Sequence, residues 1–134
     1  MPPASRREQR ERVLGLLYEA DAKGLPASQV IAELPVPPDE FVVDLVEGVG
    51  SRADEVDKLI ADNAIDWSLA RMPVVDRTLL RVATFELLAR PDVPTGAVIS
   101  EAVELAKQYS TDESGRFVNG VLASIAVQVR PAAG

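Results

Sequence analysis

Cysteine and histidine are both absent from the 134 residues of this chain. Their absence excludes disulfides, thiolate nucleophiles, the usual zinc sites and the histidine base that many enzymes use near neutral pH. The chain also lacks a glycine-rich phosphate loop, and no cluster of carboxylates has the spacing of a metal site. The sequence therefore predicts a protein that is not an enzyme and that holds neither a metal nor a cofactor.

Long apolar runs are missing as well. No stretch reaches the roughly 18 apolar residues that mark a membrane helix, and residues 1–12 contain no apolar segment that could serve as a signal peptide. We therefore expect a soluble, cytoplasmic protein with no membrane partner. With 47% apolar residues the chain can build one continuous core, so residues 1–134 are expected to form a single domain.

The chain is acidic, but its basic charge gathers at one end. Residues 1–12 carry four arginines and two glutamates, a net charge of +2, so the total of −7 leaves −9 for residues 13–134. An acidic surface repels phosphates at long range, which argues against indiscriminate nucleic-acid binding. Any nucleic-acid contact is expected to involve the N-terminal segment.

Apolar residues recur at helical spacing along most of the chain, and no segment alternates in the way that a strand does. Helices are expected at residues 5–22, 26–34, 39–63, 73–89, 95–106 and from 110 onward, with one helical turn at 66–71. Thr95 is expected to cap the helix that it opens, and Ser110 with Glu113 to form a capping box. The predicted fold is an all-α bundle of about six to seven helices.

Arg6, Arg7 and Arg10 are the first candidates for binding. They fall within about one turn of the first predicted helix, and each guanidinium offers a planar fork of donors suited to phosphate oxygens. Arginine at a helix N-terminus opposes the helix dipole, so local helix stability does not explain the group. The alternative is a solubilising helix end, which composition alone favours.

A second candidate lies around the start of the last predicted helix. Lys107, Tyr109, Arg116 and Phe117 set two cations and two aromatic rings close together in the chain. Single-stranded RNA is typically bound by aromatic faces for the bases and cations for the phosphates. The alternative is that both rings belong to the core or to a hydrophobic staple.

Two further features have ordinary explanations. Glu101 and Glu104 stand three residues apart and could share a metal, but no histidine accompanies them and such pairs are common on helix surfaces. Trp67, the single tryptophan, is more often a core anchor than a ligand platform, although its polar neighbours leave that open.

Several motifs together resemble the NusB family. Three segments carry the resemblance to the C-terminal half of those proteins: RPDVP at 90–94, VISEAVELAK at 98–107 and RFVNGVL at 116–122. Upstream, residues 6–11 with Leu17 and Tyr18 are similar to the family's arginine-rich first helix, and residues 79–81 and 85–87 to its central helix. The resemblance covers nearly the whole chain and is weakest between residues 23 and 38.

The resemblance implies a fold of two packed three-helix subunits and a role in transcription antitermination. NusB-type proteins bind the single-stranded box A element of nascent transcripts, chiefly ribosomal RNA leaders, together with NusE, a small-subunit ribosomal protein. The complex then joins other Nus factors on RNA polymerase and suppresses premature termination. Some family members self-associate, so a homodimer that controls RNA access is a further expectation.

The resemblance also implies which residues do the binding. The family's RNA surface corresponds here to Arg6, Arg7, Arg10, Lys107, Tyr109, Arg116 and Phe117, and its NusE-facing surface to Tyr18, Asp76 and Glu113. Two positions depart from the family pattern: Glu8 interrupts the arginine run, and Gly115 stands where a histidine is common. Because Glu8 weakens the local positive field, we expect RNA binding to depend on NusE.

Two rival functions remain at this point. One is a protein-interaction or dimerisation module that does not bind RNA, which Glu8 and the overall acidity favour and the arginine group opposes. The other is an accessory domain of an RNA methyltransferase, because a similar helical unit occurs fused to such enzymes. The chain has no glycine-rich cofactor loop, so in that role it would need a separate enzyme.

Overall fold

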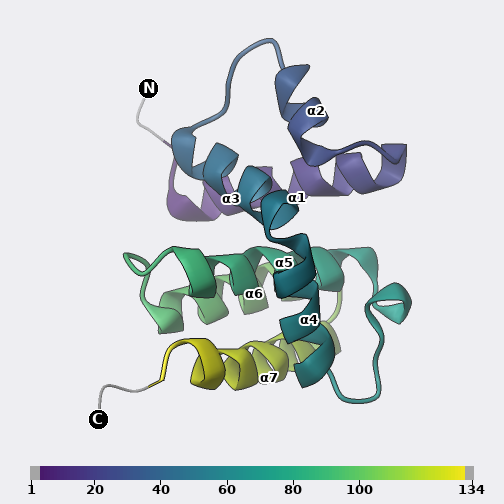
Figure 1. Cartoon of the computed structure of the whole chain (residues 1–134), viewed down its shortest axis with the longest axis vertical. Helices are drawn as coiled ribbons and strands as arrows, with labels where there is room; N and C mark the ends of the chain where they lie inside the picture. The colour runs from purple at the N-terminus through teal and green to yellow at the C-terminus, as the bar shows by residue number, and fades with distance from the viewer. Residues whose placement is uncertain (1–3, 132–134) are drawn as a thin grey trace.

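All regular secondary structure in the computed structural model, which describes residues 4–131, is helical (Figure 1). In chain order the elements are α1 (Arg6–Lys23), α2 (Ala27–Ala32), α3 (Glu40–Ser51), α4 (Ala53–Asn63), the 3-10 turn η1 (Leu69–Arg71), α5 (Val74–Ala89), α6 (Thr95–Tyr109) and α7 (Asp112–Val129). The prediction of an all-α bundle of about six to seven helices is confirmed. None of the described helices is both long enough and apolar enough to cross a membrane.

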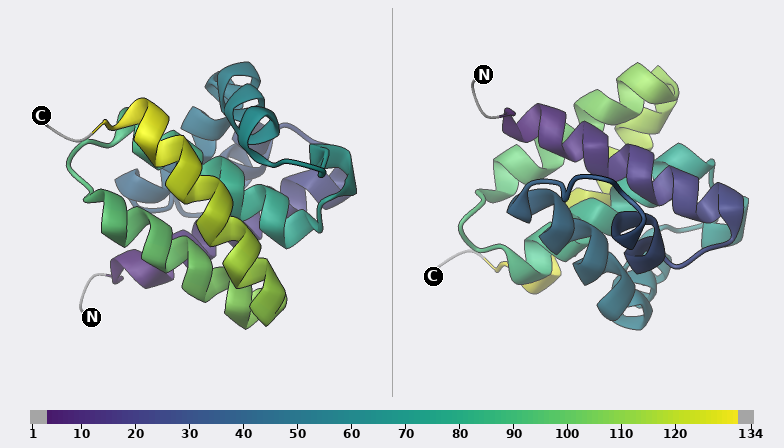
Figure 2. Two further views of the ribbon diagram at one scale, coloured as in Figure 1. Left: turned by 90° about the horizontal axis from the view of Figure 1, so that it is seen from below. Right: turned by 90° about the horizontal axis from the view of Figure 1, so that it is seen from above.

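The helices form two subunits that share one core. Helices α1, α2 and α3 pack together in the upper part of Figure 1, and α4, α5, α6 and α7 pack together below them. Helix α5 joins the two because it contacts both α1 and α3 as well as its own subunit. Its buried residues surround most of its circumference, as its nearly continuous apolar sequence predicts. The α6–α7 hairpin lies side by side in Figure 2 and completes the second subunit.

The second subunit holds one helix more than expected. The single helix predicted over residues 39–63 is broken at Arg52, whose backbone leaves the helical region at φ −116° and ψ 27°. Gly48 and Gly50 precede the break, and glycine is a weak helix former. The change of direction lets α3 pack on α1 and α2 while α4 packs on α5 and α7. Val56 and Ile60 of α4 are then fully buried.

The helix ends correct two details of the sequence prediction. Pro94, not Thr95, is the N-cap residue of α6, and the Thr95 hydroxyl instead accepts a hydrogen bond from Arg130 Nη1 at 3.1 Å. Helix α7 begins one residue later than predicted, so its cap is Thr111 rather than Ser110. The Ser114 amide donates to Thr111 Oγ1 at 3.0 Å.

Glu8, which interrupts the arginine run, takes part in the cap of α1. The Glu8 amide donates to Ser5 Oγ at 3.1 Å, and the Ser5 amide donates to Glu8 Oε1 at 3.2 Å. This reciprocal pair is a capping box and satisfies two backbone donors that the first turn would otherwise leave open. The acid at position 8 therefore stabilises the helix that carries Arg6 and Arg7.

Gly48 sets how closely α3 and α5 approach each other. A Cβ atom at this position would lie 2.0 Å from Cζ of the buried Phe85 ring. We expect Gly48→Ala to lower the free energy of unfolding by about 1–3 kcal/mol, because the ring must leave its rotamer or the helices must separate. Urea denaturation followed by circular dichroism measures the change.

Gly50→Ala is the matched control for that substitution. Gly50 is exposed on the same helix, and a Cβ there meets nothing within 4 Å. Because alanine is the better helix former by about 1 kcal/mol, this variant should be as stable as the original or more so. Equal effects at positions 48 and 50 would show that helix propensity, not the approach to Phe85, governs this crossing.

Candidate functional site

Arg7 lies in the first turn of α1 and reaches across to α6. Its Nε donates to Glu101 Oε2 at 2.6 Å and its Nη2 to Glu101 Oε1 at 3.0 Å, a bidentate pair at the surface. The hydrogen bonds from Arg7 hold the pKa of Glu101 below its ordinary value, and the same bonds raise the pKa of Arg7. Glu101 therefore pairs with an arginine, and no group of three potential ligands among residues 4–131 could hold a metal.

Arg6 turns to the other side of α1. Its guanidinium carbon lies 3.7 Å from the centre of the Phe41 ring, which is within the range of a cation–π interaction. Its Nη1 also donates to Gln9 Oε1 at 3.3 Å. Arg6 remains exposed beside α3, and Arg7 is exposed beside α6. Both guanidinium groups are therefore accessible to a ligand, but on different sides of α1.

Arg10 does not belong to this exposed group. Its side chain is 6% exposed, and it forms a bidentate pair with Glu86 of α5, which is 1% exposed. The two bonds are Nε to Oε2 at 3.0 Å and Nη2 to Oε1 at 2.6 Å. This corrects the prediction that Arg6, Arg7 and Arg10 form one phosphate-facing cluster. Arg10, one turn beyond Arg6, lies on the side of α1 that packs against α5 of the second subunit.

The last turn of α6 carries Lys107 and Tyr109 and lies beside α1. Tyr109 is 47% exposed, and its hydroxyl donates to Glu11 Oε2 of α1 at 2.5 Å. That hydrogen bond raises the pKa of Tyr109 above its ordinary value. Lys107 Nζ lies 3.8 Å from Glu104 Oε1. Together with Arg7, these side chains form what we call the α1–α6 surface.

Gly115 makes room for the Lys107 side chain. A Cβ at position 115 would lie 2.9 Å from Lys107 Cγ and 3.2 Å from its Cε. Gly115 therefore lets the lysine stem lie against the first turns of α7. Arg116, the next residue, is exposed.

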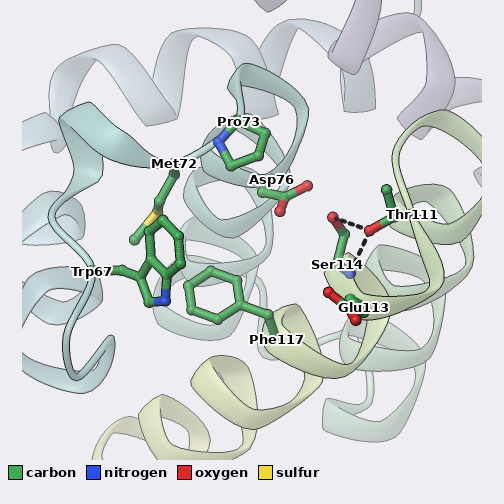
Figure 3. A pocket seen from close by; sticks show the side chains of 8 residues that line it. All are labelled: Trp67, Met72, Pro73, Asp76, Thr111, Glu113, Ser114 and Phe117. Carbon is green, nitrogen blue, oxygen red and sulfur yellow. Dashed lines mark hydrogen bonds between the residues drawn. The ribbon is translucent and has the colours of Figure 1, made fainter.

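Phe117 has different neighbours from Tyr109. Its ring meets Trp67 edge to face, with the ring centres 6.4 Å apart and the planes at 63°. Both rings line a cleft between the start of α5 and the start of α7, with a volume of about 300 Å³, which we call the α5–α7 cleft (Figure 3). The cleft is lined by Trp67, Met72, Pro73, Asp76, Thr111, Glu113, Ser114 and Phe117.

The α5–α7 cleft mixes residues from both predicted surfaces. It contains Asp76 and Glu113, which were expected to face NusE, together with Phe117, which was expected to face RNA. Tyr18, the third residue expected to face NusE, is half exposed on α1. The structure thus divides the predicted RNA residues, with Arg7, Lys107 and Tyr109 on the α1–α6 surface and Phe117 in the cleft.

Sequence reasoning left Trp67 undecided, and the structure places it in the cleft with 50% of its surface exposed. The residue before it, Asp66, has a left-handed backbone with φ 71°. The signal available in the sequence was a lone tryptophan among polar residues. Its partner Phe117, 50 residues further along the chain, could not be identified from that signal.

These features define an all-helical protein with surfaces suited to binding other macromolecules. The NusB family model matches residues 7–127. The transcription antitermination protein NusB of Salinispora tropica is 50% identical over 129 residues, covering 91% of this chain and 95% of that protein. The one from Streptomyces griseus is 43% identical over 129 residues, covering 90% of each. The chain belongs to the NusB family.

Solved structures agree with this assignment. NusB of T. maritima superposes with a TM-score of 0.83 at 36% identity, covering 93% of this chain and 92% of that one. A crystal structure of the antitermination factors NusB and NusE with double-stranded RNA contains a chain with a TM-score of 0.78 at 28% identity, covering 92% and 96%. Family membership confirms the prediction of a transcription antitermination protein that is not an enzyme.

Proposed function

We propose that this protein binds RNA together with a NusE protein, as the similar NusB chain does in its complex with NusE and double-stranded RNA. The observation that supports this most is the α1–α6 surface. There Arg7 and Tyr109 are both exposed and are tied to the partner helix through Glu101 and Glu11. An exposed aromatic ring beside cations suits single-stranded RNA. Its bases can stack on the ring, and its phosphates attract the guanidinium groups.

The RNA that we propose is the single-stranded box A element of nascent transcripts. Arg6, Arg7, Lys107 and Arg116 would contact phosphates, and Tyr109 would stack on a base. Tyr18, Asp76 and Glu113 would face NusE, and through that complex the protein would act on RNA polymerase with the other Nus factors in the cytoplasm. Self-association into a homodimer stays a prediction.

The acidic neighbours on the α1–α6 surface support a requirement for the partner. Each of its three functional side chains already has an acidic neighbour, namely Glu101 for Arg7, Glu11 for Tyr109 and Glu104 for Lys107. A phosphate has to compete with these carboxylates, so the protein alone should bind RNA weakly. When NusE binds both the protein and the RNA, it raises the effective concentration of the RNA at the α1–α6 surface.

The proposal is tested with Arg7→Ala. Labelled box A RNA is titrated with the protein, with and without NusE, across a series of salt concentrations, and binding is followed by fluorescence anisotropy. We expect affinity to fall several-fold, and the slope of log K against log salt to become shallower by roughly 0.7, as the loss of one phosphate contact on a single strand predicts.

Arg52→Ala is the matched control for this experiment. Arg52 also lies at the start of a helix and pairs with a carboxylate at the surface, Glu55 Oε1 at 2.6 Å, but it is the N-cap residue of α4, away from the α1–α6 surface. It should change neither affinity nor salt dependence. If Arg7→Ala behaves like Arg52→Ala, Arg7 makes no phosphate contact. A scrambled RNA that binds equally well would refute box A recognition.

A further inference from the structure

Glu101 already occupies donors of Arg7 that a phosphate would use. Its two carboxylate oxygens accept from Arg7 Nε at 2.6 Å and from Arg7 Nη2 at 3.0 Å. These donors form one edge of the planar guanidinium, and that edge binds a carboxylate or a phosphate in the same bidentate way. A phosphate on the remaining edge would still lie close to the negative charge of Glu101, which repels it. Glu101 therefore opposes a phosphate at either edge of Arg7.

Arg6, in the same turn of α1, has no such competitor. Its guanidinium lies over the Phe41 ring and donates to the neutral amide oxygen of Gln9. It forms no ion pair with any residue from 4 to 131. The two exposed arginines of this turn therefore differ, because Arg6 is open to an anion and Arg7 is already paired with one.

The other two acids of the α1–α6 surface compete less directly. Glu104 Oε1 lies 3.8 Å from Lys107 Nζ, which is too long for a hydrogen bond, so the ammonium keeps its donors. Glu11 accepts from the hydroxyl of Tyr109, a neutral side chain whose ring would meet a base rather than a phosphate. Among these acids, Glu101 is thus the one that a phosphate has to displace.

We propose that Glu101 limits the RNA affinity of the free protein by competing with the phosphate backbone for Arg7. This rests on the proposed function, because it concerns the same surface. Every nucleotide carries the same phosphate, and contacts with phosphates hold no sequence information. Glu101 therefore sets how strongly RNA binds, and it does not select which sequence binds.

Glu101→Gln tests this inference, because it keeps the size of the side chain and removes its charge. Without NusE, we expect the variant to bind box A RNA about two- to fivefold more tightly, the range given by the strength of an exposed ion pair. A scrambled RNA of the same length should gain by the same factor. Fluorescence anisotropy at one fixed salt concentration measures both affinities, and thermal melting checks that the variant is folded.

Two backgrounds separate competition for Arg7 from a general change in charge. In Arg7→Ala, Glu101→Gln should lose most of its effect, because the contested donors are gone. In Arg6→Ala, it should raise affinity by the same factor as in the original protein. Glu55→Gln is the matched control, since Glu55 also pairs with an exposed arginine, Arg52 at 2.6 Å, but on α4. It removes one negative charge and should leave RNA affinity unchanged.

Separate results overturn the separate claims. If Glu101→Gln binds RNA more weakly, Glu101 positions Arg7 for RNA and does not compete with it, so the inference is refuted. An unchanged affinity refutes it too, as does a gain that is equally large in the Arg7→Ala background. In these cases the proposed function stands as long as the original protein binds box A RNA with NusE. If the original protein does not bind that RNA even with NusE, the proposed function fails and this inference with it.

Discussion

Replacing Arg10 with alanine should lower the free energy of unfolding by about 3–5 kcal/mol, because it leaves the Glu86 carboxylate buried without its partner. The pair joins α1 of the first subunit to α5 of the second through two hydrogen bonds at 3.0 and 2.6 Å. Urea denaturation followed by far-ultraviolet circular dichroism measures the loss. Glu86→Gln should also destabilise the protein, because Arg10 then lacks its counter-charge.

The control for this prediction removes both charges. Arg10→Met combined with Glu86→Leu should recover most of the stability lost in either single variant, because apolar side chains of similar size replace a costly buried ion pair. If each single variant lost less than about 1 kcal/mol, the pair would behave like a surface salt bridge and its assigned burial would be refuted.

The Arg10 result also bears on how RNA-binding data should be interpreted. Arg6 and Arg7 are exposed, whereas Arg10 is a structural residue, so its loss would reduce RNA binding through unfolding rather than through a lost phosphate contact. Binding by Arg10→Met/Glu86→Leu separates the two explanations. If that folded double variant binds RNA normally, Arg10 makes no RNA contact.

Arg130→Ala should lower the free energy of unfolding by about 2–4 kcal/mol, since a charged donor satisfies several partly buried carbonyl groups at once. The guanidinium follows the last turn of α7 and closes the C-terminal end of α5. It donates to the carbonyl oxygens of Glu86, Leu87, Val93 and Arg90 and to Thr95 Oγ1, at distances of 2.6 to 3.1 Å. Leu87 lies in the last turn of α5, where the final carbonyls lack partners within the helix, so this side chain helps to cap that end.

Arg130→Lys should recover only part of that loss, because an ammonium group cannot span carbonyls that a planar fork reaches. Arg116→Ala serves as the control. Arg116 is exposed on the same helix, and its loss should change stability by less than about 0.5 kcal/mol. If Arg130→Lys were as stable as the original protein, the geometry of the fork would be irrelevant and charge alone would explain the contact.

The sequence by itself determined the helices of this protein and its family. Helical periodicity, proline breaks and the three C-terminal motifs depend on residues close together in the chain, so they can be recognised without a fold. The separation of α3 from α4 was missed although Gly48 and Gly50 weaken the helix before Arg52. Two glycines do not fix where a helix ends, and it is the packing of α4 on α5 and α7 that places the break at Arg52.

Only the tertiary structure decided which charged residues are available for binding. Arg6, Arg7 and Arg10 look equivalent in the sequence, yet one lies on Phe41, one pairs with Glu101 at the surface and one is buried with Glu86. The same holds for Asp76, which is buried only when α5 and α7 enclose it with Trp67. Helical spacing shows which residues share a face, but the element that covers that face comes from a distant part of the chain. Burial and pairing are therefore properties of the assembled fold.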